Sequence, residues 1–78
     1  MALVRYIKEE TLAPALTGDS DRTEDANGVV CWTLTGPGSI VVKWKDAQRP
    51  DQPHGAVLAG TKVWYDRKNH VLEIEERK

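Results

Sequence analysis

Three side chains of this chain could bind a soft metal ion or take part in covalent chemistry: Cys31, His54 and His70. Their spacing matches none of the CxxC, HxH or HExxH patterns that hold zinc. A zinc site would need all three, together with a carboxylate, to meet from separate parts of the fold. Cys31 would need a neighbouring base to act as a nucleophile, and the predicted register places it opposite Lys43, which favours the thiolate slightly, but beside no histidine. We therefore expect no enzymatic activity, no catalytic set, no metal and no cofactor.

A second group with chemical potential is the set of carboxylates within residues 17–28, namely Asp19, Asp21, Glu24 and Asp25. Oxygen ligands at alternating positions are typical of calcium loops. The spacing does not fit an EF-hand, because Glu24 stands where that loop needs glycine and Val30 stands where it needs a bidentate glutamate. We predict an exposed loop here, with an acidic docking surface for a basic partner as the alternative.

Basic residues gather in the second half of the chain, and those suited to one binding face are Lys43, Lys45 and Lys62. Small β-barrels bind single-stranded nucleic acids by combining a basic groove with exposed aromatic rings on which bases stack. Tyr65 is the aromatic residue that we expect to point outward and to serve in this way. Basic side chains that merely solvate an outward face are the alternative.

The polar segment 46–55 is the other candidate for contacts. Pro50 and Pro53 lack backbone donors, which excludes a central strand or a helix interior. Arginine is enriched at protein interfaces, and proline lowers the entropy cost of ordering a loop. We take Arg49 and His54 as candidate protein-binding residues, with a passive connection as the alternative.

Two patterns of alternating apolar residues predict the elements that position these side chains. Residues 29–45 predict a hairpin with Gly36-Pro37-Gly38 as a three-residue loop. A loop one residue shorter or longer would mix apolar and polar residues on each face. The favoured register pairs the apolar residues of the two arms: Leu34 with Ile40, Trp32 with Val42 and Val30 with Trp44.

Residues 61–76 predict a second hairpin, with Arg67-Lys68-Asn69 as its loop. The asparagine takes the left-handed conformation that this residue type tolerates. In the resulting register Trp64 lies opposite Leu72 and points inward, whereas Tyr65 belongs to the other, more open face.

These hairpins predict an all-β fold, a small five-stranded antiparallel barrel or sandwich with little or no helix. Residues 3–9 favour a strand, although Leu3 and Ile7 also fit one face of a helix. A short strand is expected at residues 56–59. The 78 residues have room for a single domain, 1–78, and no repeat or linker divides them.

The composition narrows the class of protein. The formal charge of −1 argues against non-specific nucleic-acid binding as the main activity, since a basic field accompanies that function. A lone cysteine cannot form an intrachain disulfide. We expect neither a signal peptide nor a bilayer-spanning segment, because the first residues lack a long apolar run and no stretch approaches about 20 apolar residues. We expect a cytoplasmic protein that does not bind membranes.

We therefore expect a small non-enzymatic protein-binding module. Compact chains of this kind often serve as regulators or inhibitors, including some encoded by phages and other mobile elements. Binding of single-stranded nucleic acid through Lys43, Lys45, Lys62 and Tyr65 is one alternative, and a structural subunit of a larger assembly is another. Strand edges would also allow a homo-oligomer.

Overall fold

The computed structural model describes residues 2–7, 12–44 and 48–77, and this part of the chain contains strands and no helix. The strands are β1 (Ala2–Ile7), β2 (Leu12–Thr17), β3 (Ser20–Glu24), β4 (Val29–Leu34), β5 (Gly38–Trp44), β6 (Gln52–Val57), β7 (Lys62–Asp66) and β8 (Val71–Glu76). All paired neighbours are antiparallel. The predicted all-β class is confirmed.

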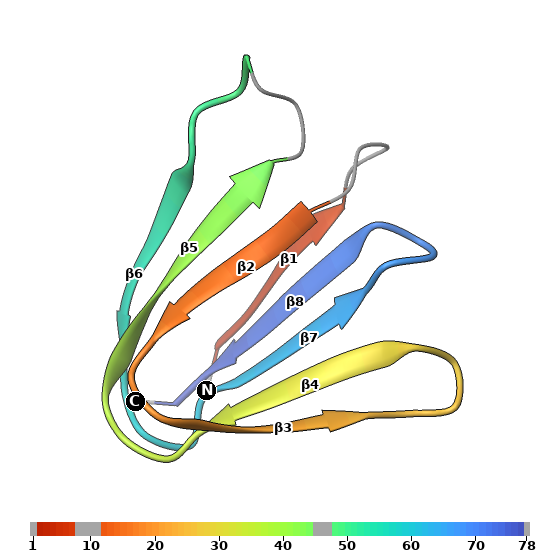
Figure 1. Ribbon diagram of the computed structural model, residues 1–78. Helices are drawn as coiled ribbons and strands as arrows, with labels where there is room; N and C mark the ends of the chain where they lie inside the picture. Colours follow the sequence, from red (N-terminus) through yellow and green to blue (C-terminus); the bar gives the residue numbers. More distant parts are fainter. Residues whose placement is uncertain (1, 8–11, 45–47, 78) are drawn as a thin grey trace.

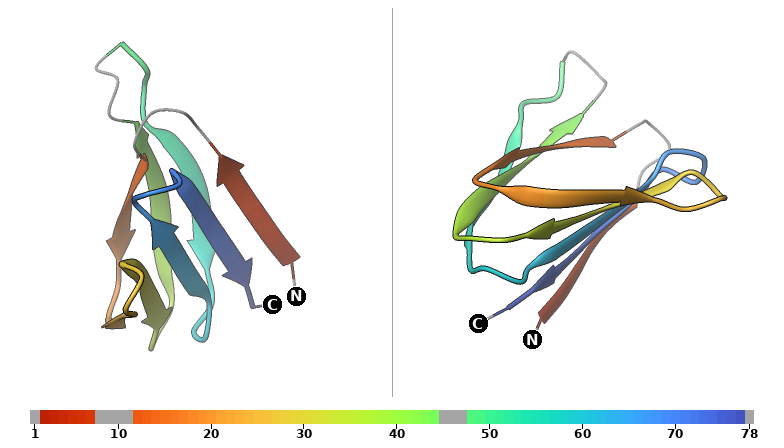
Figure 2. Two further views of the ribbon diagram at one scale, coloured as in Figure 1. Left: turned by 90° about the vertical axis from the view of Figure 1, so that its right-hand side faces the viewer. Right: turned by 60° about the horizontal axis from the view of Figure 1, so that its bottom comes forward.

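The strands form two sheets, a five-stranded one with the order β1-β8-β7-β4-β3 and a three-stranded one with the order β2-β5-β6. Three stretches of chain run through both sheets, since β2 bends into β3, β4 into β5 and β6 into β7 (Figure 1). One antiparallel meander is thus folded over on itself, and Figure 2 shows the bends from two further sides. The result has two layers and is not a closed barrel.

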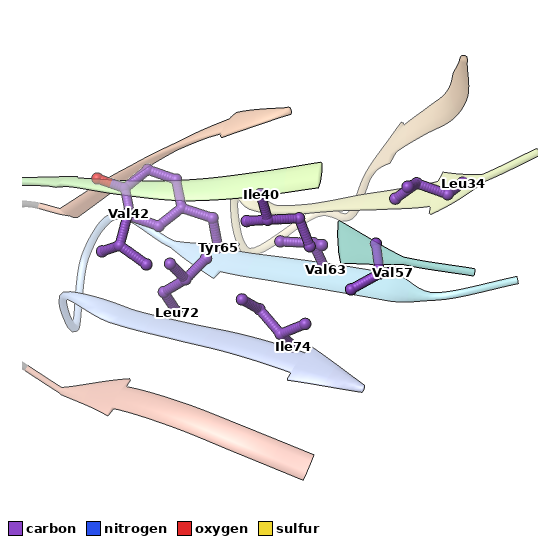
Figure 3. Close-up of a cluster of buried hydrophobic side chains, with 8 residues drawn as sticks. All are labelled: Leu34, Ile40, Val42, Val57, Val63, Tyr65, Leu72 and Ile74. Carbon is purple, nitrogen blue, oxygen red and sulfur yellow. The ribbon is translucent and has the colours of Figure 1, made fainter. Parts of the chain in front are cut away.

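The core lies between the two layers (Figure 3). It is made of eight buried side chains from five strands: Leu34, Ile40, Val42, Val57, Val63, Tyr65, Leu72 and Ile74. In β8 the alternation is strict, because Leu72 and Ile74 are fully buried while Glu73 and Glu75 lie on the opposite face. Burying each large apolar side chain contributes roughly 1.5–3 kcal/mol. The period-2 pattern therefore fixes which face of each strand turns inward.

Residues 29–45 do not form the predicted hairpin. β4 pairs with β3 and β7, whereas β5 pairs with β2 and β6. Leu34 and Ile40 do point into one core, as expected, but they reach it from different sheets. The apolar alternation correctly predicts that Leu34 and Ile40 are buried, but the predicted pairing of the two strands is wrong. A bent strand and a hairpin can bury the same residues.

The corner between β4 and β5 depends on a close approach of two backbones. A Cβ atom on Gly38 would lie 2.1 Å from the carbonyl oxygen of Thr17, and one on Gly18 would lie 2.8 Å from that of Pro37. Gly18 also has a φ of +92°, which favours glycine. The Thr35 N–H donates to the carbonyl of Asp19 at 3.0 Å, so the ladder continues through the bend. No side chain fits where the two strands cross.

The second hairpin exists, but its loop has four residues, 67–70, and not three. Asp66 is paired with Val71, and Tyr65 with Leu72. The positive φ, +54°, belongs to His70 and not to Asn69. Because the loop is one residue longer than predicted, the inward and outward faces of β7 are exchanged relative to those of β8.

As a consequence, the predicted orientations of two aromatic residues are wrong. Tyr65 lies in the core, with 6% of its surface exposed. Trp64 lies on the outer face, opposite Glu73 of β8 and Cys31 of β4.

The polar segments are also more ordered than expected. Residues 17–28 include β3, which is exposed along its whole length. Residues 52–57 form β6, so the strand begins earlier than predicted and contains Pro53. This proline and Pro14 of β2 both lie on edge strands, where a missing donor is tolerated. β1 confirms the strand for residues 3–7, and residues 8 and 9 lie outside the described part of the chain.

Candidate protein-interaction surface

The outer face of the five-stranded sheet carries an open hollow of about 480 Å³, which we call the Trp64 groove. Its lining comes from four strands and one turn: Leu3, Val29, Trp64, Asp66, Asn69, Val71, Glu73 and Glu75. Trp64 lies on this face because the four-residue loop places Tyr65 opposite the buried Leu72 and Trp64 opposite Glu73. The groove is therefore a direct product of the observed register.

The Trp64 groove combines an apolar surface with acidic groups. Leu3, Val29 and Val71 supply aliphatic surface around the indole, and Leu3 is 56% exposed. Three carboxylates, those of Asp66, Glu73 and Glu75, complete the lining. Among the described residues that line it there is no lysine or arginine. An indole next to carboxylates is a surface that attracts a cation.

Two local interactions fix the acidic groups. The Arg5 guanidinium lies 3.1 Å from a Glu73 carboxylate oxygen, which ties β1 to β8 across the groove face. The Asp66 carboxylate accepts hydrogen bonds from the backbone N–H groups of Lys68 and Asn69 and from the Asn69 amide. The Asn69 amide is the largest cause that lowers the pKa of Asp66, so this group carries its charge at neutral pH.

The basic residues chosen from the sequence are not brought together on one face. Lys43 is exposed on β5 of the three-stranded sheet, whereas Lys62 is exposed on β7 of the other sheet, opposite Glu75. Tyr65 is in the core and cannot stack on a base. Lys45 lies outside the described residues.

Arg49 has a partner within the chain. Its guanidinium carbon lies 4.4 Å from the centroid of the Trp44 ring, a cation–π contact between the loop before β6 and the end of β5. Because part of its binding capacity is used here, Arg49 stabilises this end of the three-stranded sheet.

The sequence predicts an exposed loop at His54, but this residue lies in a strand, β6. The pairing of β5 with β6 shifts between Ile40 and Val41, where Gly55 and Pro53 are the partners, so His54 is the extra residue of a β-bulge. Gly55 has a φ of +112°, which the bulge requires. The bulge turns the imidazole inward, and only 6% of the side chain is exposed.

The buried imidazole joins the two sheets. His54 Nε2 lies 2.6 Å from a Glu76 carboxylate oxygen, and His54 Nδ1 lies 3.2 Å from the Tyr6 hydroxyl. Neutral His54 satisfies both partners if Nε2 donates to Glu76 and Nδ1 accepts from Tyr6. We call Tyr6, His54 and Glu76 the histidine clasp. It connects β6 to β1 and β8 on a side where no backbone ladder joins the layers.

The histidine clasp has the hydrogen-bond order of a catalytic triad but not the electrostatics of one. An attacking phenol would need a lowered pKa or a base that removes its proton in a substrate-filled site. Burial, and then the nearby charge of Glu76, raise the pKa of Tyr6. The phenol therefore keeps its proton, and the arrangement serves to hold the layers together.

The other residues considered for chemistry have local roles in the described part of the chain. No three histidine, cysteine, aspartate or glutamate side chains converge there to hold a metal ion. Asp25 accepts hydrogen bonds from the N–H groups of Asn27 and Val29, which shape the turn between β3 and β4. Cys31 is half-buried beside Trp64.

The sequence did contain a signal for the Trp64 groove. Glu73 and Glu75 alternate with Leu72 and Ile74, so β8 has one apolar and one acidic face. A four-residue loop is the one that places Tyr65 and Val63 opposite the apolar face. The alternation of β8 therefore predicts that Trp64 points outward, whereas the three-residue loop predicts that it points inward.

No helix long and apolar enough to cross a membrane occurs among residues 2–7, 12–44 and 48–77. Comparisons of the chain with protein-family models, with curated proteins and with solved structures find no match.

Proposed function

We propose that this chain is a small non-enzymatic protein-binding module and that the Trp64 groove is its contact surface. The observation that carries the proposal is the half-buried indole surrounded by three carboxylates and aliphatic side chains on an outer sheet face. Tryptophan is enriched among the residues that dominate binding energy at protein interfaces. The partner is a protein segment that presents a lysine or arginine flanked by apolar residues.

Charge complementarity supports this class of partner. A guanidinium or ammonium group over the Trp64 ring would gain a cation–π contact, and Glu73 or Glu75 would accept its hydrogen bonds. The same acidic groups repel phosphates, and Lys43 and Lys62 belong to separate sheets. These facts favour a protein partner over single-stranded nucleic acid.

The scale of the surface sets the expected affinity. A hollow of about 480 Å³ accommodates one or two side chains, far fewer than the roughly 20–30 residues that each partner contributes to a standard protein interface. We infer a transient interaction with a short segment. Such an interaction suits a regulator or inhibitor, including one encoded by a phage or other mobile element, and this role is part of the proposal.

The test uses a displayed library of short peptides selected on the whole chain. We expect enriched peptides to carry lysine or arginine next to apolar residues. Trp64→Ala should weaken binding of a recovered peptide at least tenfold, and the double variant Glu73→Gln/Glu75→Gln should weaken it and reduce its salt dependence.

A matched control removes the same charge elsewhere. Asp19→Asn/Asp21→Asn changes two exposed carboxylates near β3 and should leave peptide affinity unchanged. Enrichment of acidic peptides, or affinity that does not respond to Trp64→Ala, would contradict the proposal. Salt-dependent quenching by single-stranded DNA or RNA, with no peptide selected, would favour nucleic acid instead.

A further inference from the structure

The described strands leave four sheet edges, and three of them carry features that discourage pairing with another chain. β2 contains Pro14, and β6 contains Pro53 as well as the bulge at His54. β3 is exposed throughout, and three of its five residues are charged: Asp21, Arg22 and Glu24. Prolines, bulges and charges are the usual protection of an edge strand.

β1 is the exception. Its six residues, ALVRYI, include one charged residue, Arg5, and that charge is paired with Glu73. β1 pairs with β8 on one side only, and the left panel of Figure 2 shows it at the margin of its sheet. Leu3 is one of two large apolar residues exposed in the described part of the chain. The outer edge of β1 thus offers a row of backbone donors and acceptors without any of the usual protection.

We propose that β1 pairs with β1 of a second copy of this chain, antiparallel and about a twofold axis. Opposed residues in an antiparallel pair point to the same face. Leu3 and Arg5, which belong to the outer face of β1, must therefore oppose outer-face positions of the second copy. A register that opposes Arg5 to the second copy's Arg5 places like charges side by side, which is unfavourable.

Several registers avoid this clash, and the one with Val4 on the axis pairs the longest part of β1, residues 2–6. Leu3 then lies opposite the second copy's Arg5, and this pair occurs twice. Glu75 is the neighbour of Leu3 on β8, so the row across the interface runs from Glu73 and Arg5 of one chain to Leu3 and Glu75 of the other. This register opposes no like charges, and the exposed Leu3 is covered by the aliphatic part of an arginine.

Pairing in this register joins two five-stranded sheets into one continuous sheet of ten strands and leaves the histidine clasps inside their own chains. This inference does not depend on the proposed function, although Leu3 also lines the Trp64 groove. Trp64→Ala should remove peptide binding and leave the dimer intact, so the two proposals can fail separately.

The test measures the mass of the chain by light scattering over a wide concentration range. We expect a dimer at high concentration for the wild type and a monomer for Leu3→Lys. Thr23→Lys is the matched control, because it adds the same charge to the outer face of the opposite edge strand, β3, and should leave the dimer unchanged. An unchanged melting temperature would show that Leu3→Lys is folded.

A cross-linking experiment tests the register. In a Cys31→Ser background, Val4→Cys should give a covalent dimer on mild oxidation, since residues on the twofold axis are close enough for a disulfide. Arg5→Cys in the same background should give much less. A wild-type monomer at every concentration, a dimer insensitive to Leu3→Lys, or preferential cross-linking at residue 5 would overturn the inference.

Discussion

Residues 29–44 and 62–76 have similar alternating patterns but fold in different ways. The first segment passes through a corner from the five-stranded sheet into the three-stranded one, whereas the second turns back within a single sheet. Both bury the same kind of apolar face. The comparison shows that alternation decides which side chains go inside, and that the connecting residues and the neighbouring strands decide how the chain gets there.

The two connections differ in what holds them. At the corner, Gly38 and Gly18 allow the backbones of two strands to approach. The backbone carbonyls of Asp19 and Thr61, in neighbouring segments, accept hydrogen bonds from the N–H groups of residues 35 and 34. At the hairpin, the Asp66 side chain organises its own turn by accepting bonds from residues 68 and 69. One connection is stabilised by tertiary contacts and the other by local ones.

The largest effect should come from closing the space at the corner. Gly38→Ala places a methyl group 2.1 Å from the Thr17 carbonyl oxygen, where backbone must move to make room. We expect it to reduce the free energy of unfolding by about 4–5 kcal/mol, measured by denaturant titration. Gly36→Ala is the control, because its methyl group meets nothing within 4 Å, and it should change stability by less than about 1 kcal/mol. Equal losses of stability in the two variants would contradict the close approach of Gly38 to Thr17 at the corner.

The next effect tests the hairpin register. Tyr65→Ala removes a core side chain and should cost about 3–4 kcal/mol. Trp64→Ala, one residue away on the outer face, should cost about 1 kcal/mol. The two denaturation midpoints measured side by side would decide the matter. A larger loss for Trp64→Ala would restore the three-residue loop.

A smaller effect should follow loss of the histidine clasp, which connects β6 to β8, two strands that form no ladder with each other among the described residues. His54→Ala leaves Glu76 and Tyr6 without their partner and should cost about 1–3 kcal/mol. His70→Asn, in the hairpin, is the control. Among the described residues His70 Nδ1 has no hydrogen-bond partner, and asparagine tolerates its positive φ, so stability should change by no more than about 0.5 kcal/mol. Similar midpoints for both variants would argue against the clasp.

The smallest effect concerns the charge in the hairpin turn. The Asn69 amide, as the largest cause, lowers the pKa of Asp66 below its ordinary value of 3.8. The stabilisation is therefore present above that value and disappears as the pH falls through the lowered pKa. Asp66→Asn should lower stability at neutral pH and remove this part of the acid dependence. Denaturant titrations at neutral and strongly acidic pH would measure both, and a parallel loss in wild type and variant would contradict the assignment.

Local patterns were enough to predict some features of this molecule. The all-β class, the strand at β1 and the burial of Leu34, Ile40 and Val42 follow from alternation alone. The corner could not be predicted in this way, because the need for Gly38 arises from Thr17, twenty-one residues away. The position of His54 depends likewise on a bulge that is defined by its partner strand.

The candidate site was missed for a related reason. Arg49, His54 and Tyr65 have residue types that suit binding, but the fold uses all three internally. The residues that remain available around Trp64 become neighbours only when β1, β4, β7 and β8 have formed one sheet. Their proximity is a property of the strand order, which short-range patterns do not encode.

The place of β8 in the five-stranded sheet has a consequence for how the chain acquires its structure during synthesis. β8 lies between β1 and β7, so β1 obtains its pairing partner only after residues 71–76 have been translated. Leu72 and Ile74 are supplied equally late. Until residue 76 has emerged from the ribosome, β1 and one edge of β7 remain unpaired, and pairings between distant segments form slowly. These two strands are therefore the ones most open to wrong pairing and aggregation before β8 is made.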